Sequence, residues 1–426
     1  MTGRKLPRPE GWPELSDDAL HGLAGEVVDT IEPHTEADKA ALLLTYIVAF
    51  GNAVGQGPYV VADGARHPPN EFAVLVGDTS RARKGTSAAQ ILPIINYGDP
   101  TWASCRVSGL ASGEGVMQRL SEEGVDPRLF VIESEFARLL TVGNRDGSIL
   151  SSVIRDAWDG IPLQHVTRRD PLKVDDHHIS VLAHVTQTEL HDRLSSTDVA
   201  NGFGNRFLFA VVTRSKLLPH GGDLDEFAYR RLGTQTTEVL TAVRKFRRLR
   251  RTPEADAMWV TMYSTMSAAP DGQAGQLTAR AEAHLLRLSL LYALIDGCEA
   301  IDVQHLSAAW ELYRYCHQSV LALGEQIKPD VEQRLLDALR EAGDAGLTGT
   351  QQRDLFGRHL SGQKLDSARQ RLEAAGLAVT REISTDGRPR LLTMATDPPS
   401  DQSDESDLSH LSDLPSLRSL RSQGGV

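Results

Sequence analysis

Cysteines, aromatic residues and long apolar runs are scarce in this chain of 426 residues. The three cysteines lie far apart, so the sequence encodes neither a disulfide framework nor a Cys-x-x-Cys zinc site, and a reducing cytoplasm is the expected location. The longest apolar stretch, Leu285 to Ile295, is interrupted by Arg287 and Ser289, and the N-terminus has no apolar segment typical of a signal peptide. We expect a cytoplasmic protein with no membrane span and no membrane partner.

Positive charge is also in deficit. A net charge of −12 and a pI near 5.6 exclude a surface that is basic all over, so any nucleic-acid site must be a local basic face. The length suggests two or three domains, and a hydrophobic content of 40% is enough to fill their cores.

The most informative stretch follows a short apolar run. Residues 72–76, FAVLV, predict a buried parallel strand, which leads into a glycine, six polar or small residues and then Lys-Gly-Thr-Ser. A nucleoside triphosphate needs inward-facing backbone N–H groups, a lysine for the β/γ charge and a hydroxyl for Mg²⁺. The stretch therefore predicts a loop that binds ATP and Mg²⁺. The candidate ligands are Gly77, Thr79, Lys84, Gly85, Thr86 and Ser87.

This loop departs from the common pattern G-x-x-x-x-G-K-[ST]. Arg83 precedes the lysine, a glycine follows it, and Lys84 lies seven residues after Gly77 instead of six. The Mg²⁺ hydroxyl must then come from Thr86 or Ser87, and the sequence leaves both open. For the loop alone, an ordinary surface turn with solvated arginines is the alternative interpretation.

A second apolar strand ends in acidic residues. The segment 129–136, LFVIESEF, places Glu133 and Glu135 where a buried parallel strand presents carboxylates at its carboxyl end, beside the phosphate loop of a neighbouring strand. One carboxylate would hold Mg²⁺, with Glu133 as candidate together with Thr86, and the other would activate the attacking water. A plain strand end is the alternative interpretation.

Two further segments complete the predicted catalytic set. A strand over 178–185 ends in polar residues; in ATPases of this architecture it lies between the other two strands, and Thr186 or Gln187 is the candidate sensor of the γ-phosphate. A cap for the following helix is its alternative role. A glycine-rich turn then places Arg206 where a subunit edge could present it to a neighbour's γ-phosphate. An ion pair with a nearby carboxylate is the structural alternative, and Arg214 is the second candidate.

Hydrophobic periodicity predicts several helices. One begins near Glu36 with Thr35 as its cap, and one over 88–95 is shortened or kinked by Pro93. From about residue 217 the pattern becomes helical, over 223–251, 256–269, 277–295 and 305–323. Residues 328–395 then follow the order helix, helix, helix, hairpin, which is typical of a winged helix.

These patterns predict an α/β fold whose P-loop NTPase core is followed by helices and a small C-terminal domain. In the tail, leucines recur every third residue from Leu408 to Leu420, a spacing that drifts around an α-helix, and serine and aspartate dominate. We expect an extended lead-in over 1–18, the P-loop core with a parallel sheet and N-terminal helices over 19–216, a helical lid domain over 217–326, a winged-helix domain over 327–395 and a disordered tail over 396–426.

Two regions could contact DNA. The run 244–251 holds six cations in eight residues, although most such runs are solvated helix faces. The third helix and the hairpin of the small domain carry further cations, and a winged helix that docks a protein is the alternative there. The candidate DNA contacts are Arg247, Arg248, Arg250, Lys364, Arg369 and Arg388.

As an ordered set, the segments resemble the P-loop ATPase region of the DUF3987 type, found in phage and plasmid replication proteins and beside primase-polymerases of mobile elements. The resemblance covers roughly residues 20–325 and is carried by EPHTEADKAALL, GNAVGQGPY, LVGDTSRARKGTS, SGLASGEG, FVIESEFARLL, IRDAWDG, HISVLAHVT and NGFGNRFLFAVVTRSK. It implies a phosphate loop at Lys84 and Thr86, an acidic strand end at Glu133 and Glu135, a sensor at Thr186 and an arginine of the NRF motif at Arg206. Ser134 stands where this family has Asp, so the division of metal and base roles between the two glutamates stays open.

The resemblance implies an ATP-hydrolysing, helicase-like motor or initiator that acts on DNA in the replication of a mobile element. It also implies a ring of identical subunits in which Arg206 acts across the interface. We expect no primase domain ahead of residue 20, so a primase or polymerase would be a separate chain. Two alternatives stay open: a DNA-binding regulator that binds ATP without turnover, and an interaction scaffold with a degenerate ATP site.

Overall fold

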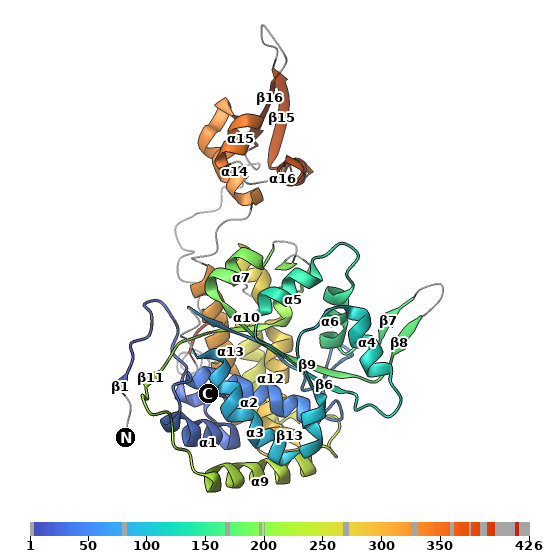
Figure 1. Cartoon of the computed structure of the whole chain (residues 1–426), viewed down its shortest axis with the longest axis vertical. Coiled ribbons are helices and arrows are strands. Elements are labelled where there is room, and N and C mark those ends of the chain that lie inside the picture. The colour runs from blue at the N-terminus through green and yellow to red at the C-terminus, as the bar shows by residue number, and fades with distance from the viewer. Residues whose placement is uncertain are drawn as a thin grey trace. The chain divides into compact units, whose positions relative to one another are not determined.

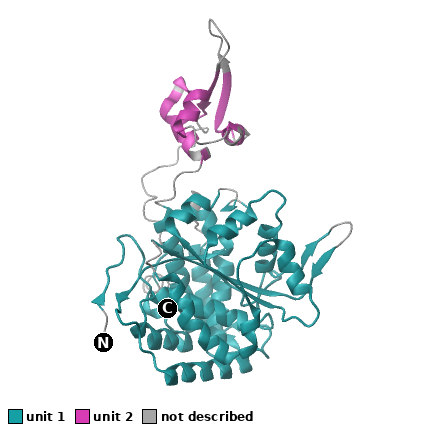
Figure 2. Cartoon of the chain, in the orientation of Figure 1, with its two compact units in different colours: residues 1–326, 410–426 teal, residues 327–409 magenta. Residues whose placement is uncertain are grey.

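The computed structural model describes residues 4–78, 83–166, 171–195, 198–199, 201–266, 272–324, 331–357, 362–374, 376–383, 390–396 and 414–416. The chain forms two compact units, shown in Figure 2. The first combines Met1–Gln326 with His410–Val426, and the second is Ile327–Ser409. Each unit has its own hydrophobic core. In the described part of the chain, no helix has the length and apolarity that crossing a membrane requires.

A parallel sheet of five strands lies at the centre of the first unit (Figure 1). Every pair of neighbouring strands in it is parallel. The expectation that the strand ending near Thr186 lies between the phosphate-loop strand and the acidic strand is confirmed. The sequence did not predict the edge strand β5, because two residues are too short for a pattern. The order across the sheet is β10 (Leu208–Val212), β4 (Phe72–Gly77), β9 (His178–Thr186), β6 (Arg128–Glu133) and β5 (Arg106–Val107).

Helices cover both faces of this sheet, and alternate side chains of each strand enter different cores. In β4, Ala73 and Leu75 join the first core while Phe72, Val74 and Val76 join the second. The strands are therefore buried on both faces, which explains their continuous apolar runs. Helices that contribute to the first core are α1 (Gly22–Ile31), α2 (Lys39–Val54), α3 (Lys84–Gly98), α9 (Glu226–Val243), α10 (Pro253–Met266), α12 (Ala281–Ile295) and α13 (Val303–Gly324). Those that contribute to the second are α4 (Gly113–Ser121), α5 (Phe136–Gly143), α6 (Leu150–Asp159), α7 (Gln187–Arg193), α11 (Gly272–Thr278) and the C-terminal part of α13.

Two helix boundaries differ from the prediction. Helix α2 begins at Lys39 and not near Glu36, because the Asp38 carboxylate accepts the N–H of Ala40 at 3.0 Å and caps the helix. Helix α3 begins at Lys84 and continues through Pro93 to Gly98, so the prediction of a shortened helix was wrong. Its N-terminus therefore directly follows the segment predicted to bind phosphate.

The helices beyond residue 217 do not form a separate compact body. They belong to the same unit as the sheet, and α9 packs along α3. The first of them ends at Val243 and not at Arg251, so the prediction of a single helix over 223–251 was wrong. The basic run lies beyond the helix and leads into the short strand β12 (Arg250–Arg251), which pairs with β13 (Ala300–Ile301).

Short elements complete the first unit. The N-terminal residues are not a bare lead-in: β1 (Arg4–Lys5) pairs with β11 (Lys216–Leu217), and Arg8 bonds the Asp38 carboxylate at 3.0 Å. Two hairpins pair β2 (Val60–Ala62) with β3 (Ala65–His67) and β7 (Leu163–His165) with β8 (Leu172–Val174). The 3-10 helices are η1 (Asp17–Ala19), η2 (Glu32–His34), η4 (Pro100–Cys105) and η5 (Gly204–Arg206).

The second unit shows the predicted order of elements, with three helices ahead of a hairpin. Leu335, Leu339, Leu365 and Leu372 form its small core. Its antiparallel sheet has the order β14, β16, β15. The bounds are α14 (Val331–Ala342), η6 (Gly343–Ala345), β14 (Leu347–Thr348), α15 (Gly349–Leu355), α16 (Gly362–Ala374), β15 (Ala378–Ile383) and β16 (Arg390–Ala395).

Candidate functional site

The carboxyl edge of the sheet gathers most of the predicted site residues. Gly77 ends β4, Thr186 ends β9 and is its register partner, and Glu133 ends the next strand, β6. Lys84 begins the helix that follows β4. Because the strands are parallel, their carboxyl ends meet at one edge, where α/β folds bind their ligands. Thr79 lies outside the described residues.

Arg83 takes the left-handed backbone conformation directly before Lys84, with φ of 56°. In the common loop pattern glycine occupies this position, because glycine adopts positive φ without steric cost. Gly85, by contrast, lies in the first turn of α3, and a Cβ built there would meet no atom of the described residues outside its own helix within 4 Å. As far as the described residues go, open space therefore adjoins the backbone at Gly85, beside helical N–H groups that favour an anion.

Lys84 is half-buried at the start of α3. Burial lowers the pKa of Lys84, and the carboxylates of Glu189 and Asp78 act in the opposite direction. Glu189, in the first turn of α7, was not among the predicted site residues. The spacing T-x-x-E, typical of a capping box, could have marked it in the sequence.

The two candidate Mg²⁺ hydroxyls differ in environment. Ser87 is fully buried, and its Oγ donates to the Lys84 carbonyl at 2.9 Å and lies 3.1 Å from the Thr45 hydroxyl, which donates to the Ala41 carbonyl at 2.6 Å. Thr86 is partly exposed, and its hydroxyl makes no hydrogen bond within the described part of the chain. The geometry therefore favours Thr86 as the hydroxyl open to a ligand.

The two acidic residues at the end of β6 also differ in burial and in hydrogen bonding. Glu133 is buried, and its Oε1 accepts the backbone N–H groups of Gly109 at 2.5 Å and Leu110 at 2.9 Å, which anchors the loop ahead of α4. Glu135 is exposed at the N-cap position of α5, and its side chain makes no capping hydrogen bond there. Of the pair, Glu135 is the carboxylate that solvent reaches.

Thr186 forms the cap that was its alternative role. Its hydroxyl accepts the N–H of Glu189 at 3.2 Å, while the Glu189 carboxylate accepts the N–H of Thr186 at 3.0 Å. These hydrogen bonds from the backbone and hydroxyl of Thr186 lower the pKa of Glu189. His184 lies on the same strand, β9, two residues before Thr186. Burial, and to a lesser extent the positive charge of Lys84, lower the pKa of His184 to about 4. His184 is therefore neutral near pH 7.

Arg206 lies just before the amino end of β10, whereas Lys84 follows the carboxyl end of the neighbouring strand β4. The two residues are therefore at opposite ends of the parallel strands. Arg206 is buried, with an exposed fraction of 5%, and its Nη2 pairs with Asp159 at 2.6 Å. The expectation that Arg206 is presented to a neighbouring subunit was wrong for this structure. The side chain instead makes the ion pair that was its structural alternative.

Arg214 follows β10 at the phosphate-loop edge. Its Nη2 lies 2.5 Å from Oε1 of Glu36, and Oε2 of the same carboxylate lies 3.0 Å from Nε of Arg83. Burial raises the pKa of Glu36, but hydrogen bonds from Arg214 and the Leu218 backbone outweigh it, so the net shift is downward. Glu36 is thus a charged carboxylate that holds two arginines beside Lys84. No local sequence signal marks it.

The basic run has both paired and exposed members. Arg244 pairs with Asp99, and Arg251 pairs with Asp256 at 2.8 Å. Although burial raises the pKa of Asp99, hydrogen bonds from Thr101, Arg128 and Arg244 lower it overall. The candidate DNA contacts Arg247, Arg248 and Arg250 are exposed.

The candidate DNA contacts of the second unit are only partly described. Arg369 pairs with Asp366 at 2.9 Å, one turn before it on α16. Arg388 and the side chain of Lys364 lie outside what the structure describes.

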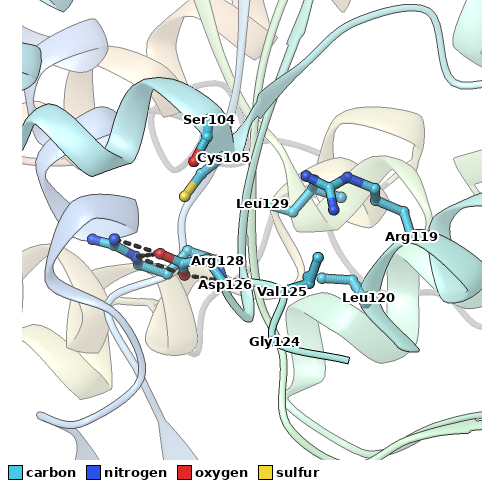
Figure 3. A pocket seen from close by; sticks show the side chains of 9 residues that line it. All are labelled: Ser104, Cys105, Arg119, Leu120, Gly124, Val125, Asp126, Arg128 and Leu129. Carbon is cyan, nitrogen blue, oxygen red and sulfur yellow. Dashed lines mark hydrogen bonds and ion pairs between the residues drawn. The ribbon is translucent and has the colours of Figure 1, made fainter. Parts of the chain in front are cut away.

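A cavity of about 170 Å³ lies at the other end of β6, where Arg128 and Asp126 form an ion pair of 2.6 Å (Figure 3). Arg128 begins β6 and Glu133 ends it, so this cavity is separate from the phosphate-loop edge. Burial raises the pKa of Cys105, in the cavity wall, to about 11, so its thiol stays protonated and unreactive near pH 7.

Within the described residues, one set of side chains has the composition of a metal site: His21, Asp296 and His305. Nδ1 of His305 accepts the N–H of Asp302 at 3.0 Å, so the ring proton lies on Nε2, which faces Asp296 at 3.3 Å. A protonated nitrogen cannot ligate a metal, and this set is better explained as contacts of the two histidines with the Asp296 carboxylate, with only His305 fully buried.

No protein-family model matches the chain, and a search of curated proteins found no match.

Proposed function

We propose that the chain is an ATP-hydrolysing, DNA-associated P-loop ATPase of the DUF3987 type that acts as a helicase-like motor or initiator in mobile-element replication. One observation carries the proposal: Lys84 at the N-terminus of α3 and the acidic end of β6 lie at the same sheet edge, with β9 between their strands. Ligands of α/β folds bind at this edge.

The residues at this edge fit a nucleotide and its metal. The N–H groups at the start of α3 and the Lys84 ammonium would bind the phosphates, and the open space beside Gly85 leaves room for them. Thr86 and Glu133 would hold Mg²⁺, which supplies charge neutralisation at the phosphates when bound. Glu135, the exposed carboxylate, would orient the attacking water and accept its proton.

The catalytic arginine is reassigned in this proposal. Arg206 is buried against Asp159, whereas Arg214 lies at the phosphate-loop edge with Glu36 as its partner. We assign Arg214 to the phosphate charge within the same subunit. A ring of identical subunits, with a separate primase or polymerase as partner, remains part of the proposal and does not depend on Arg206.

DNA would be bound through local basic faces. The exposed arginines of the run 244–251 lie on an otherwise acidic chain, and the second unit has the element order of a winged helix. Phosphate contacts of this kind give binding that weakens steeply with salt.

A second function is favoured by two specific contacts. The Thr186 hydroxyl is used in a helix cap, and Glu133 is used to anchor the backbone at Gly109 and Leu110. Because the Thr186 hydroxyl and the Glu133 carboxylate already form hydrogen bonds within the protein, the site suits a nucleotide-gated DNA-binding regulator that binds ATP without turnover. An interaction scaffold with a degenerate site would not bind ATP at all.

Two measurements distinguish the motor, the regulator and the scaffold. One is the affinity for ATP, and the other is phosphate release from ATP and Mg²⁺ with and without single-stranded and duplex DNA. We compare Lys84→Ala with Lys39→Ala, since Lys39 is likewise the first residue of a helix but pairs only weakly with Asp17 at 3.6 Å. Loss of a charged phosphate ligand should weaken ATP binding at least about tenfold in Lys84→Ala only. DNA-stimulated turnover supports the motor, and tight binding without turnover supports the regulator. Equal ATP binding by both variants and the wild type rejects this site.

A further inference from the structure

The C-terminal tail returns to the first unit at one described point. Trp310 on α13 is fully buried, and its indole Nε1 donates to the carbonyl of Pro415 at 3.1 Å. Leu414 packs against the first hydrophobic core. The predicted disordered tail therefore contains a segment, Leu414–Ser416, whose placement the structure describes.

The contact has the chemistry of a peptide site. An indole N–H can only donate, and a buried donor left without an acceptor is costly, so the Trp310 site requires a carbonyl or similar group. Pro415 provides the carbonyl, has no N–H of its own to leave unpaired, and restricts the backbone before binding. An aromatic N–H, an apolar contact and a proline together are typical of recognition of extended, proline-containing peptides.

The sequence around this segment has a matching period. Leucines recur every third residue from Leu408 to Leu420, which drifts around an α-helix but equals the three-residue turn of polyproline II. In a polyproline II helix, residues three apart lie on the same side of the chain.

We propose that the surface around Trp310 is a docking site for an extended leucine-proline peptide, and that its occupant is the chain's own tail. Along the sequence, the second unit, Ile327–Ser409, lies between the two segments that make up the first unit. Release of the tail leaves the second unit joined to the first at one end only. This docking is independent of the proposed ATPase function.

The test uses the full-length chain and a fluorescent peptide of residues 408–420. Leu414→Asp in the chain should expel the resident tail, since a carboxylate replaces an apolar contact. The Leu414→Asp chain should then bind the peptide at least about tenfold more tightly than the wild type does, because a tethered tail competes at high effective concentration. A peptide that itself carries Leu414→Asp is the matched control and should not bind.

Trp310→Phe in the Leu414→Asp chain keeps the ring and removes the N–H. Loss of one hydrogen bond should weaken peptide binding by about two- to tenfold. Hydrogen exchange at residues 414–416 of the otherwise unchanged chain should also rise in Trp310→Phe, and thermal unfolding verifies that both variants fold. Failure of the folded Leu414→Asp chain to bind the peptide, or equal binding of both peptides, would overturn the proposal.

Discussion

The Thr45 hydroxyl lies 3.1 Å from Oγ of Ser87, a residue in the first turn of α3. Ser87 Oγ also donates to the Lys84 carbonyl at 2.9 Å, so this hydroxyl is fully used inside the protein. The contact binds α2 to the helix that carries Lys84. It also leaves Thr86 as the hydroxyl accessible at the predicted metal position.

Thr86→Ala and Ser87→Ala should therefore have different effects. Thr86→Ala should reduce Mg²⁺-dependent phosphate release by about 100-fold with stability unchanged, since it removes a metal ligand and no buried contact. Ser87→Ala should lower the free energy of unfolding by about 1 kcal/mol and retain Mg²⁺ dependence. Urea unfolding and a Mg²⁺ titration of turnover measure the two effects. Loss of Mg²⁺ dependence in Ser87→Ala alone would reverse the assignment.

Glu135→Gln should separate ATP binding from turnover. The amide cannot accept the proton of the attacking water, so phosphate release should fall by about 100-fold or more while ATP affinity is retained. Glu123→Gln removes another exposed carboxylate, outside the site, and should change neither. Equal turnover of Glu135→Gln and the wild type would show that Glu135 is not the base.

Glu36→Gln should tighten ATP binding. The change removes a negative charge beside the phosphate loop and releases Arg83 and Arg214, while the amide oxygen can still accept the Leu218 N–H. For partly exposed pairs this corresponds to about a two- to fivefold gain in affinity. Glu32→Gln, whose carboxylate pairs with Lys216 at 2.6 Å, is the control. An affinity that is unchanged or weaker in Glu36→Gln contradicts the assignment of Arg214 to the phosphates.

Arg206→Ala should primarily lower stability. It breaks a buried ion pair with Asp159 and should cost about 3 kcal/mol in the free energy of unfolding. Arg230→Ala removes an exposed pair with Glu226 and should leave the free energy of unfolding nearly unchanged, because solvent screens such a pair. Chemical denaturation measures both values. If Arg206→Ala were as stable as the wild type and yet lost turnover, the result would support the original hypothesis that Arg206 acts on the γ-phosphate of a neighbouring subunit.

His178 should make folding sensitive to mild acid. Its Nε2 lies 2.9 Å from the Gly51 carbonyl, and complete burial lowers its pKa to about 3. The unfolded histidine titrates near pH 6.5, so the unfolded state binds more protons below that pH. Above pH 6.5, protonation of His178 therefore takes nothing from the free energy of unfolding. Below pH 6.5, the free energy of unfolding falls by about 1.4 kcal/mol per pH unit as the pH drops toward 3.

His178→Gln tests this pH dependence. Glutamine can donate to the Gly51 carbonyl but does not titrate, so the loss of stability between pH 7.5 and 5.5 should shrink by about 1.4 kcal/mol. His220→Gln, at an exposed position, should leave the loss as in the wild type. Urea unfolding at the two pH values measures the difference. Identical losses in His178→Gln and the wild type would exclude His178 as the source.

The sheet and its functional edge were predictable because their signals are local. Local patterns predicted the strands β4, β6 and β9, and the residues at their carboxyl ends define the edge where Gly77, Glu133 and Thr186 lie. Lys84 was predictable for the same reason, since it lies only seven residues after Gly77. β5 was missed because two residues carry no period.

The sequence by itself determined the α/β core, the position of Lys84 after β4 and the order of elements in the second unit, since each depends on neighbouring residues. Tertiary structure alone decided which side chains form hydrogen bonds and ion pairs with one another. Thr45 and Ser87 are 42 residues apart, Glu36 and Arg214 are 178 apart, and Trp310 and Pro415 are 105 apart. Partners at such separations are brought together only when the helices pack on the sheet. That packing buried Arg206, left Thr86 and Glu135 accessible, and placed the tail against Trp310.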